Sequence, residues 1–307
     1  MKYSMSIAAL AAAATVSAGP IAKRAAITDA DILNYALTLE HLEDKFYREG
    51  LANYTQADFV AAGFADPFYA NLKEVSYDET THVSFLTSAL KAAGASPVAE
   101  CTYNFPSTNA ASFVALASVL EGVGVSAYLG AAASIANPAY LTAAGSILTV
   151  ESRHSAYERA SLEESPFPQP FDDPLTLDEV YTLAAGFIVS CPSTNVALPV
   201  KAFPTLSLGT TGTIKSGDTI TLLTPGYTLA AVDGSAPVYA AFITVTGPIF
   251  GAATPVDGGF TTVVPEGVNG QSYVVLTGCK DVLTDDLTSA GPAIVEITNP
   301  YPSVASS

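Results

Sequence analysis

The sequence predicts an all-α four-helix bundle with a fifth short helix, followed by a small all-β, sandwich-like domain. Between residues 28 and 190, apolar side chains recur at helical spacing between recognisable capping signals. After about Leu198 the chain changes to short β-rich runs separated by glycine, proline and aspartate. A chain of 307 residues is long enough for two such domains.

Capping signals set the expected helix boundaries. The first helix begins at Thr28, with Asp31 completing a variant capping box, and ends at Gly50. A short helical turn follows Thr55. The second long helix is expected to begin at Asp66, with Pro67 in the first helical position, and to end at Gly94. The remaining helices are expected from about Asn109 to Ile135, from Pro138 to about Ser161, and from Thr176 to near Cys191.

The segment from Phe113 to Ala136 is nearly all apolar and could pass for a membrane span by hydropathy alone. It contains Glu121 and three glycines, at positions 122, 124 and 130, which favour a helix buried among close neighbours. We therefore expect no membrane span.

Five β-rich runs follow the helical part: residues 219–223, 238–245, 260–264, 272–277 and 293–298. Their length and spacing predict an antiparallel sandwich over residues 197–302, with a disordered tail at 303–307. No cluster of catalytic residue types falls in this region. Attachment to a cell wall or self-association is the kind of partner role we expect for it.

The N-terminus is typical of an exported protein. Residues 1–18 have the basic start, apolar run and small-residue cleavage site of a signal peptide. Residues 19–24 then form a short pro-segment ending in the pair Lys23-Arg24, unless that pair is incidental. The bundle domain would span residues 25–196. A net charge of −17 should repel nucleic acid and attract cations.

Export permits disulfides, and the chain has three cysteines. Cys101 follows one long helical segment and Cys191 ends another, so a bridge between them is the favoured pairing, with Cys279 left over. Asn53 begins an Asn-Tyr-Thr glycosylation sequon in a loop.

Glutamate and histidine recur in one pattern along the helices. Glu79 precedes His82 by three residues, and Glu151 precedes His154 by three, so each pair lies on one face of its helix. The other two long helices carry Glu40 and Glu121, each followed seven residues later by a tyrosine, Tyr47 and Tyr128. Two single glutamates and two Glu-x-x-His pairs form the ligand set of dinuclear carboxylate bundles.

This ligand set predicts two divalent ions, iron or manganese. Hard cations prefer carboxylate oxygen, and four buried glutamates without metal would be costly unless protonated or paired. Glu43 competes with Glu40 as a ligand; the tyrosine spacing favours Glu40. The histidines could instead be satisfied core residues. Glu43, Tyr47, Tyr128 and Tyr157 are candidates for contacts around the metals, the tyrosines alternatively serving as simple core aromatics.

The chain resembles the secreted ferritin-like proteins of fungi, of the stress-response or late sexual development type, with plant desiccation-related proteins as distant relatives. The resemblance is carried by Leu37 to Tyr47, by Glu79 to His82, and by Val150 to His154. It covers about residues 27–190 and implies a ferritin-like fold with a dinuclear metal site. It implies no particular reaction.

Two functions therefore compete. The first is an extracellular di-iron or di-manganese protein that reacts with oxygen or peroxide, as a ferroxidase- or catalase-like oxidoreductase would. The second is a non-catalytic cell-wall or spore-surface protein in which the metal site is structural or vestigial. The absence of a supported Ser-His-Asp or Cys-His arrangement disfavours hydrolase chemistry.

Overall fold

The computed structural model describes residues 27–229 and 236–300 of the 307-residue chain. The expected signal peptide, the pro-segment and the C-terminal tail lie outside the described residues.

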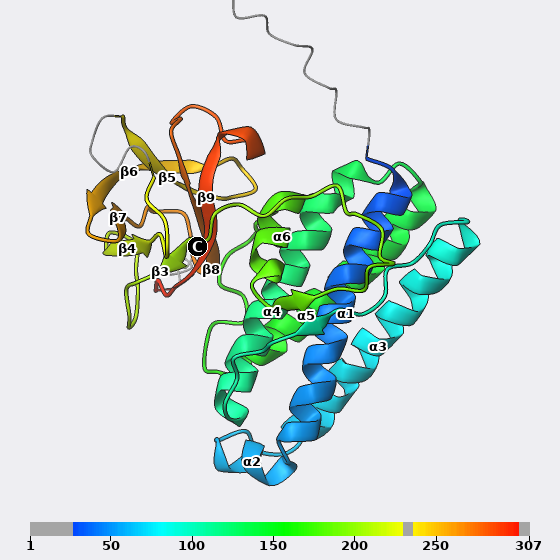
Figure 1. Ribbon diagram of the computed structural model, residues 1–307. Coiled ribbons are helices and arrows are strands. Elements are labelled where there is room, and N and C mark those ends of the chain that lie inside the picture. Colours follow the sequence, from blue (N-terminus) through cyan, green and yellow to red (C-terminus); the bar gives the residue numbers. More distant parts are fainter. Residues whose placement is uncertain (1–26, 230–235, 301–307) are drawn as a thin grey trace, which may run out of the picture.

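Four long helices form an elongated bundle: α1 (Asp29–Asn53), α3 (Phe68–Ala92), α4 (Ala110–Ala131) and α5 (Pro138–Ser161). Helix α1 packs on α3, α4 packs on α5, and the two pairs meet where α1 lies against α4 (Figure 1). Shorter helices complete this part of the chain: α2 (Gln56–Ala61), the 3-10 turn η1 (Ala132–Ser134) and α6 (Leu177–Ala185). Helix α6 lies between the bundle and the second domain, against α4 (Figure 1).

Most helix starts follow the predicted capping chemistry. Thr28 and Asp31 form a reciprocal capping box at the start of α1, and Thr176 forms one with Glu179 at the start of α6. The expected cap at Asp66 is wrong. Pro67 occupies the N-cap of α3 and has no polar side-chain atom to cap the helix. The Asp66 carboxylate instead accepts a hydrogen bond from Gln56 Nε2 at 2.7 Å.

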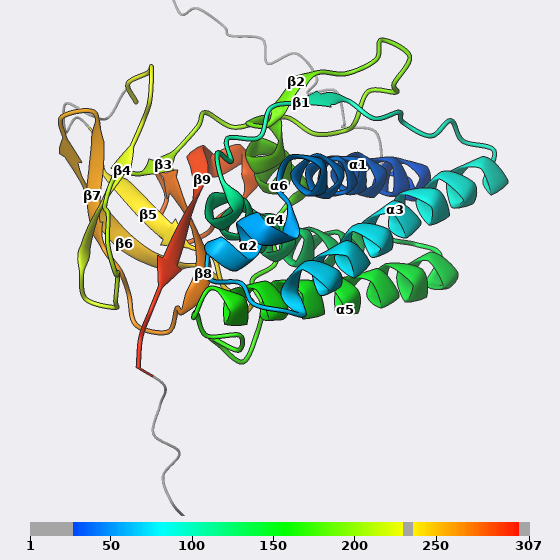
Figure 2. The same cartoon turned by 90° about the horizontal axis from the view of Figure 1, so that it is seen from below.

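The fifth predicted helix is shorter than expected. Helix α6 ends at Ala185, and Gly186 follows it as the C-cap. The β-branched pair Ile188 and Val189 then enters strand β2 (Ile188–Ser190), which pairs antiparallel with β1 (Thr102–Tyr103). This ribbon lies over α1 and α6 on the side away from α5 (Figure 2).

The predicted disulfide is present and joins Cys101 to Cys191, next to the β1–β2 ribbon, across 90 residues of sequence. Cys279 is a free, half-buried thiol. The disulfide therefore holds the segment after α3 to the segment after α6, at the edge of the bundle.

The second domain is a seven-stranded antiparallel sheet in the order β3-β4-β7-β6-β5-β8-β9. The end strands approach each other, since Gly291 N donates to Pro204 O at 3.0 Å, so the sheet nearly closes into a sandwich-like barrel. The strands are β3 (Ser207–Leu208), β4 (Thr219–Leu223), β5 (Val238–Phe242), β6 (Ile249–Val256), β7 (Gly259–Val263), β8 (Gly270–Thr277) and β9 (Thr288–Ile297), with a 3-10 turn, η3 (Asp285–Leu287), before β9.

Each predicted β-rich run overlaps a strand, although the run 238–245 extends past the end of β5. The two-residue strand β3 was not predicted, and neither was the longer strand β6. Its sequence contains Gly251, Pro255 and two alanines, which weaken the alternation that marks a strand. Its partners on both sides, β5 and β7, supply the pairing that makes it one.

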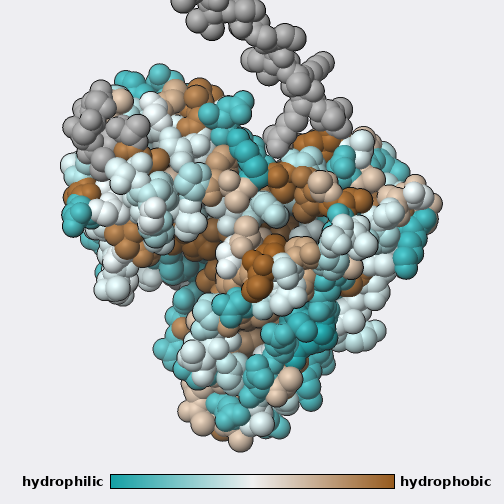
Figure 3. All heavy atoms as spheres, in the orientation of Figure 1, coloured by the Kyte–Doolittle hydropathy of each residue, from teal (hydrophilic) through white to brown (hydrophobic). Residues whose placement is uncertain are grey.

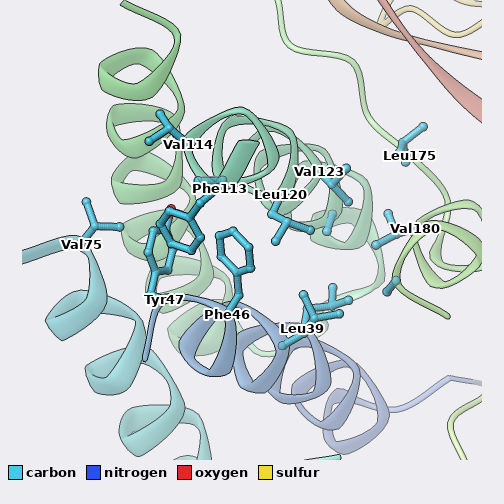
Figure 4. Close-up of a cluster of buried hydrophobic side chains, with 14 of the residues drawn as sticks. Leu39, Phe46, Tyr47, Val75, Phe113, Val114, Leu120, Val123, Leu175 and Val180 are labelled. Carbon is cyan, nitrogen blue, oxygen red and sulfur yellow. The ribbon is translucent and has the colours of Figure 1, made fainter. Parts of the chain in front are cut away.

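The two domains share a hydrophobic core. Tyr273 and Val275 of β8 and Ala241 of β5 belong to the same buried cluster as the α1–α4 interface. Figure 4 shows Leu39, Leu120 and Val123 of that interface pointing toward one another, with side chains of the α6 region opposite. In Figure 3, apolar surface gathers along the junction of the domains, whereas the far end of the bundle is mostly hydrophilic.

The apolar helix α4, the third of the four long helices, packs inside the protein. The stretch Ala110–Ser134, which continues α4 into η1, is long and apolar enough to cross a membrane, and 67% of its most apolar part is buried against the rest of the molecule. Helices in the cores of soluble proteins reach the same length and hydropathy as membrane spans, so these two properties do not identify Ala110–Ser134 as a span.

Candidate metal centre

All six predicted ligands lie together in the middle of the bundle. Helices α1 and α4 each contribute one glutamate, and α3 and α5 each contribute a Glu-x-x-His pair from one face. The four glutamates, Glu40, Glu79, Glu121 and Glu151, have no exposed surface, and His82 and His154 are 8% and 7% exposed. Four helices therefore bring four carboxylates and two imidazoles together inside the bundle.

The ligands form two overlapping groups. Glu40 and His82 converge with Glu79 and Glu151, and Glu121 and His154 converge with the same two glutamates. In each group the potential ligand atoms lie within 4.8 Å of one another. Glu79 and Glu151 belong to both groups, which is the position a bridging carboxylate takes between two ions.

Both histidines turn Nδ1 toward the carboxylates. His82 Nδ1 lies 3.2 Å from Glu40 Oε2, 3.4 Å from Glu79 Oε2 and 3.2 Å from Glu151 Oε1. His154 Nδ1 lies 3.2 Å from Glu79 Oε1 and 3.4 Å from Glu121 Oε2. An imidazole nitrogen surrounded by carboxylate oxygens at these distances is placed to share a cation with them.

The second nitrogen of His154 has a partner outside the cluster. Nε2 lies 3.2 Å from Asp78 Oδ2, a carboxylate at the surface of α3. A carboxylate on the outer nitrogen fixes the ring orientation and tautomer of a metal-binding histidine. Asp78 could not be singled out from its neighbours in sequence, because its contact is made with another helix.

Six buried polar atoms of the two ligand groups have no hydrogen-bond partner within the part of the chain that the structure describes. Both carboxylate oxygens of Glu79 and of Glu151, Oε2 of Glu121 and Nδ1 of His154 are unsatisfied. Buried carboxylates without donors are costly, whereas a bound cation would satisfy these atoms together. The residues present therefore fit one or more metal ions.

Two tyrosines each contact a glutamate of the opposite helix in the α1–α4 pair, and these two glutamates belong to different ligand groups. Tyr47 of α1 donates to Glu121 Oε1 of α4 at 2.5 Å, and Tyr128 of α4 donates to Glu40 Oε1 of α1. Each tyrosine is one heptad beyond the glutamate on its own helix, about 10.5 Å along the axis. Crosswise pairing follows from the packing of α1 against α4, so each tyrosine positions the glutamate of the opposite helix.

Two further glutamates join the centre. Glu43, 5% exposed, lies beside the cluster but belongs to neither ligand group, whereas Glu40 belongs to one of them. Glu158 is fully buried on α5, and the Tyr47 hydroxyl lies 2.7 Å from Glu158 Oε1. Glu158 was missed, although its position seven residues after Glu151 places it on the same helix face.

The hydroxyl of Tyr47 carries a single proton but lies within hydrogen-bond distance of two carboxyl groups. Burial raises the pKa of Glu158 well above its usual value, and the nearby Glu121 raises it further. A protonated Glu158 satisfies this geometry by donating to Tyr47, which in turn donates to Glu121.

Burial and mutual repulsion also keep protons on other members of the cluster. Burial raises the pKa of Glu40 to about 7, and it raises the pKa values of Glu43 and Glu151 well above the ordinary range. Burial opposes ionisation of Glu79 too, but the adjacent imidazoles of His154 and His82 outweigh it and lower the pKa of Glu79 to about 2. Of the two shared glutamates, Glu79 is therefore held in its ionised form, whereas burial favours the protonated form of Glu151.

Tyr157 and His41, which lie close in sequence to the predicted ligands, make their contacts outside the cluster. Tyr157 differs from the expectation: its hydroxyl accepts a bond from Asn71 Nδ2 at 3.0 Å, and its ring stacks on Phe68. Both partners of Tyr157 lie in the first turn of α3, and neither is a member of the cluster. His41 lies 3.2 Å from Val98 O and also faces away from the cluster.

Comparison with known proteins agrees with this geometry. The family model of the ferritin-like domain matches residues 28–164, a span that contains every residue of the cluster. The helical bundle therefore has a ferritin-like fold. Protein rds1 of Schizosaccharomyces pombe is 26% identical to the chain over 180 residues. That alignment covers 59% of this chain and 44% of the relative, so the chain spans less than half the length of the protein it matches.

Proposed function

We propose that the ferritin-like domain binds two divalent ions, iron or manganese, and that the resulting centre reacts with oxygen or peroxide. The observation that carries the proposal is the sharing of Glu79 and Glu151 between the two ligand groups. A site for one ion has no use for a second complete group around the same two carboxylates. Two adjacent redox-active ions, when bound, supply two electrons together, which suits ferrous oxidation or peroxide disproportionation.

The side chains divide the work of such a centre. Glu40 with His82 would hold one ion and Glu121 with His154 the other, and Glu79 and Glu151 would contribute to both. Four carboxylates offset the charge of two divalent ions. Tyr47 and Tyr128 hold the terminal glutamates in place, and Glu158 holds a proton next to one of them.

We further propose that the protein works outside the cell. The signal-like N-terminus supports this location, and the Cys101–Cys191 disulfide is compatible with it. Helix α1 runs to Asn53 instead of ending at Gly50, so the sequon begins at the last residue of the helix and not in a loop. The Asn53 side chain is exposed there and accessible to an oligosaccharide. Glycosylation of the secreted protein at Asn53 is part of the proposal.

Metal analysis of variants tests the dinuclear centre. The purified protein, loaded anaerobically with ferrous or manganous ion, should hold about two equivalents. Glu79→Gln removes a shared ligand and should lose both ions, whereas Glu121→Gln should retain one ion more strongly than the other. Glu74→Gln changes an exposed glutamate on the same helix as Glu79 and serves as the control.

Protein that takes up no metal after anaerobic loading would overturn the dinuclear proposal. Loaded protein that turns over neither ferrous iron nor peroxide, but loses thermal stability on chelation, would assign the metals a structural role. That second result would support the non-catalytic extracellular alternative.

A further inference from the structure

A pocket of about 140 Å³ lies between the bundle and the sheet domain, beside the metal-binding cluster. Helices α1 and α4 form its inner wall, and α6 with the following residue Phe187 forms its side. Ile294 of β9 closes it from the sheet domain. A cavity needs roughly 10–15 Å³ to hold one water, so this pocket has room for a small organic molecule.

The pocket is apolar except at one point. Leu42, Val123, Leu183, Phe187 and Ile294 are among its lining residues, and Glu43 is the one ionisable side chain there. Glu43 is 5% exposed, and no hydrogen bond or ion pair to its carboxyl group occurs among the described residues. A buried carboxyl group without a partner, in an otherwise apolar wall, is placed to bind the polar end of a ligand.

Glu43 also borders the metal-binding cluster. A Cβ atom added at Gly124 would lie 2.9 Å from Glu43 Oε1 and 3.1 Å from Glu151 Oε2. The carboxyl groups of Glu43 and Glu151 therefore both lie against the α4 backbone at Gly124, where no side chain intervenes. Because Gly124 lines the pocket as well, the pocket ends next to a shared metal ligand.

We propose that this pocket binds a short aliphatic molecule with a single hydrogen-bonding head group, held by Glu43 next to the cluster. The inference rests on the proposed function in so far as it names the substrate class of the same centre. The wall excludes sugars, nucleotides and other molecules with many polar groups, because their hydroxyls and phosphates would have no partners there. It also gives the sheet domain a role, since Ile294 supplies part of the wall.

Binding to the metal-free protein tests the pocket independently of the metals. The probes are 1-butanol, which has a hydroxyl head, and 1-chlorobutane, which has nearly the same shape and no donor. Methyl NMR should show both probes shifting the resonances of Leu42, Val123 and Ile294. No shift of these methyl groups at saturating probe would overturn the proposal.

Three variants assign the contacts. Glu43→Leu should weaken 1-butanol binding about tenfold and leave 1-chlorobutane binding unchanged, because only the alcohol loses a hydrogen bond. Leu183→Trp should abolish binding of both probes by filling the pocket from α6. Ile294→Phe fills it from the sheet domain and provides the same test if the first filling variant fails to fold.

A control uses the separate apolar cavity between α1, α3, α4 and α5, which Ala143 lines. Ala143→Leu should leave the affinity for both probes unchanged. Equal 1-butanol affinity in Glu43→Leu and in the unmodified protein would overturn the role of Glu43. If the protein binds the probes but takes up no metal, the pocket proposal stands and the dinuclear function is rejected. If it takes up metal but binds neither probe, the dinuclear function stands and the pocket proposal is rejected.

Discussion

At the residue scale, each of the two tyrosines contacts a glutamate of only one ligand group. Tyr47 contacts Glu121, which belongs to the ligand group of His154, and Tyr128 contacts Glu40, which belongs to the group of His82. Partners of this kind orient a ligand without touching the ion. Their removal should therefore act on one ion at a time.

Tyr47→Phe should weaken binding at the Glu121 group, and Tyr128→Phe should weaken binding at the Glu40 group. Loss of such a partner typically lowers metal affinity by about 10–100-fold. Competitive titration with a chelator of known affinity would resolve the two ions in each variant. Equal weakening of both ions in both variants would contradict the crosswise assignment.

Metal binding should also release protons. Burial raises the pKa of Glu40 to about 7; for His154 burial acts in the opposite direction, but the Glu121 and Glu79 carboxylates outweigh it and raise its pKa to about 12. The metal-free centre therefore binds protons at neutral pH that an incoming ion must displace.

Affinity should consequently rise with pH across the neutral range, by about tenfold per pH unit for each proton released. Calorimetric titration in buffers of different ionisation enthalpy counts these protons directly. An affinity independent of pH between about pH 6 and about pH 8 would show that the ligands are already deprotonated.

At the element scale, glycine on α4 decides how close the helices and carboxylates come. At Gly124 the bare backbone accommodates Glu43 and Glu151, whereas Gly145 on α5 has no atom within 4 Å of an added Cβ. The two glycines are both helical, so their replacement has the same effect on helix propensity and a different effect on the centre.

Gly124→Ala should lower metal affinity, because the new methyl group must displace one or both carboxyl groups. Gly145→Ala should leave metal affinity unchanged and stabilise the protein by up to about 1 kcal/mol. Metal titration and denaturant unfolding of the two variants give the comparison. Unchanged metal affinity in Gly124→Ala would show that the carboxyl groups can move aside at no cost.

At the scale of the whole molecule, the domains are joined by polar contacts as well as by their shared core. Tyr273 of β8 donates to Gly122 O of α4 at 3.0 Å and accepts from Ser126 Oγ at 3.0 Å. Arg159 of α5 forms two bonds with Glu296 of β9, at 2.7 and 2.9 Å. Such a junction should make the two domains unfold together.

Tyr273→Phe should lower the free energy of unfolding by about 1–2 kcal/mol, since it leaves buried partners on α4 unsatisfied. Tyr239→Phe, on β5 of the same domain, removes a half-buried hydroxyl without a hydrogen bond among the described residues and should cost little. Calorimetry should show one transition for the unmodified protein. Two well-separated transitions would contradict coupling between the domains.

The sequence by itself determined the helices and the residue types of the centre. Capping residues and helical periodicity depend on neighbours within one turn, so Thr28, Asn109 and Thr176 could be recognised as helix starts. Spacing of three residues likewise placed each Glu-x-x-His pair on one face. The ordered repeat of this pattern then predicted four helices around a common site.

Only the tertiary structure decided which side chains meet. The sharing of Glu79 and Glu151, the inclusion of both Glu43 and Glu158, and the pocket closed by Ile294 all depend on contacts between elements far apart in sequence. Helical spacing gives the face that a residue occupies, but not the neighbour that packs against that face. That neighbour is set by the packing of α1 on α4 and of the sheet domain on both, which no local pattern encodes.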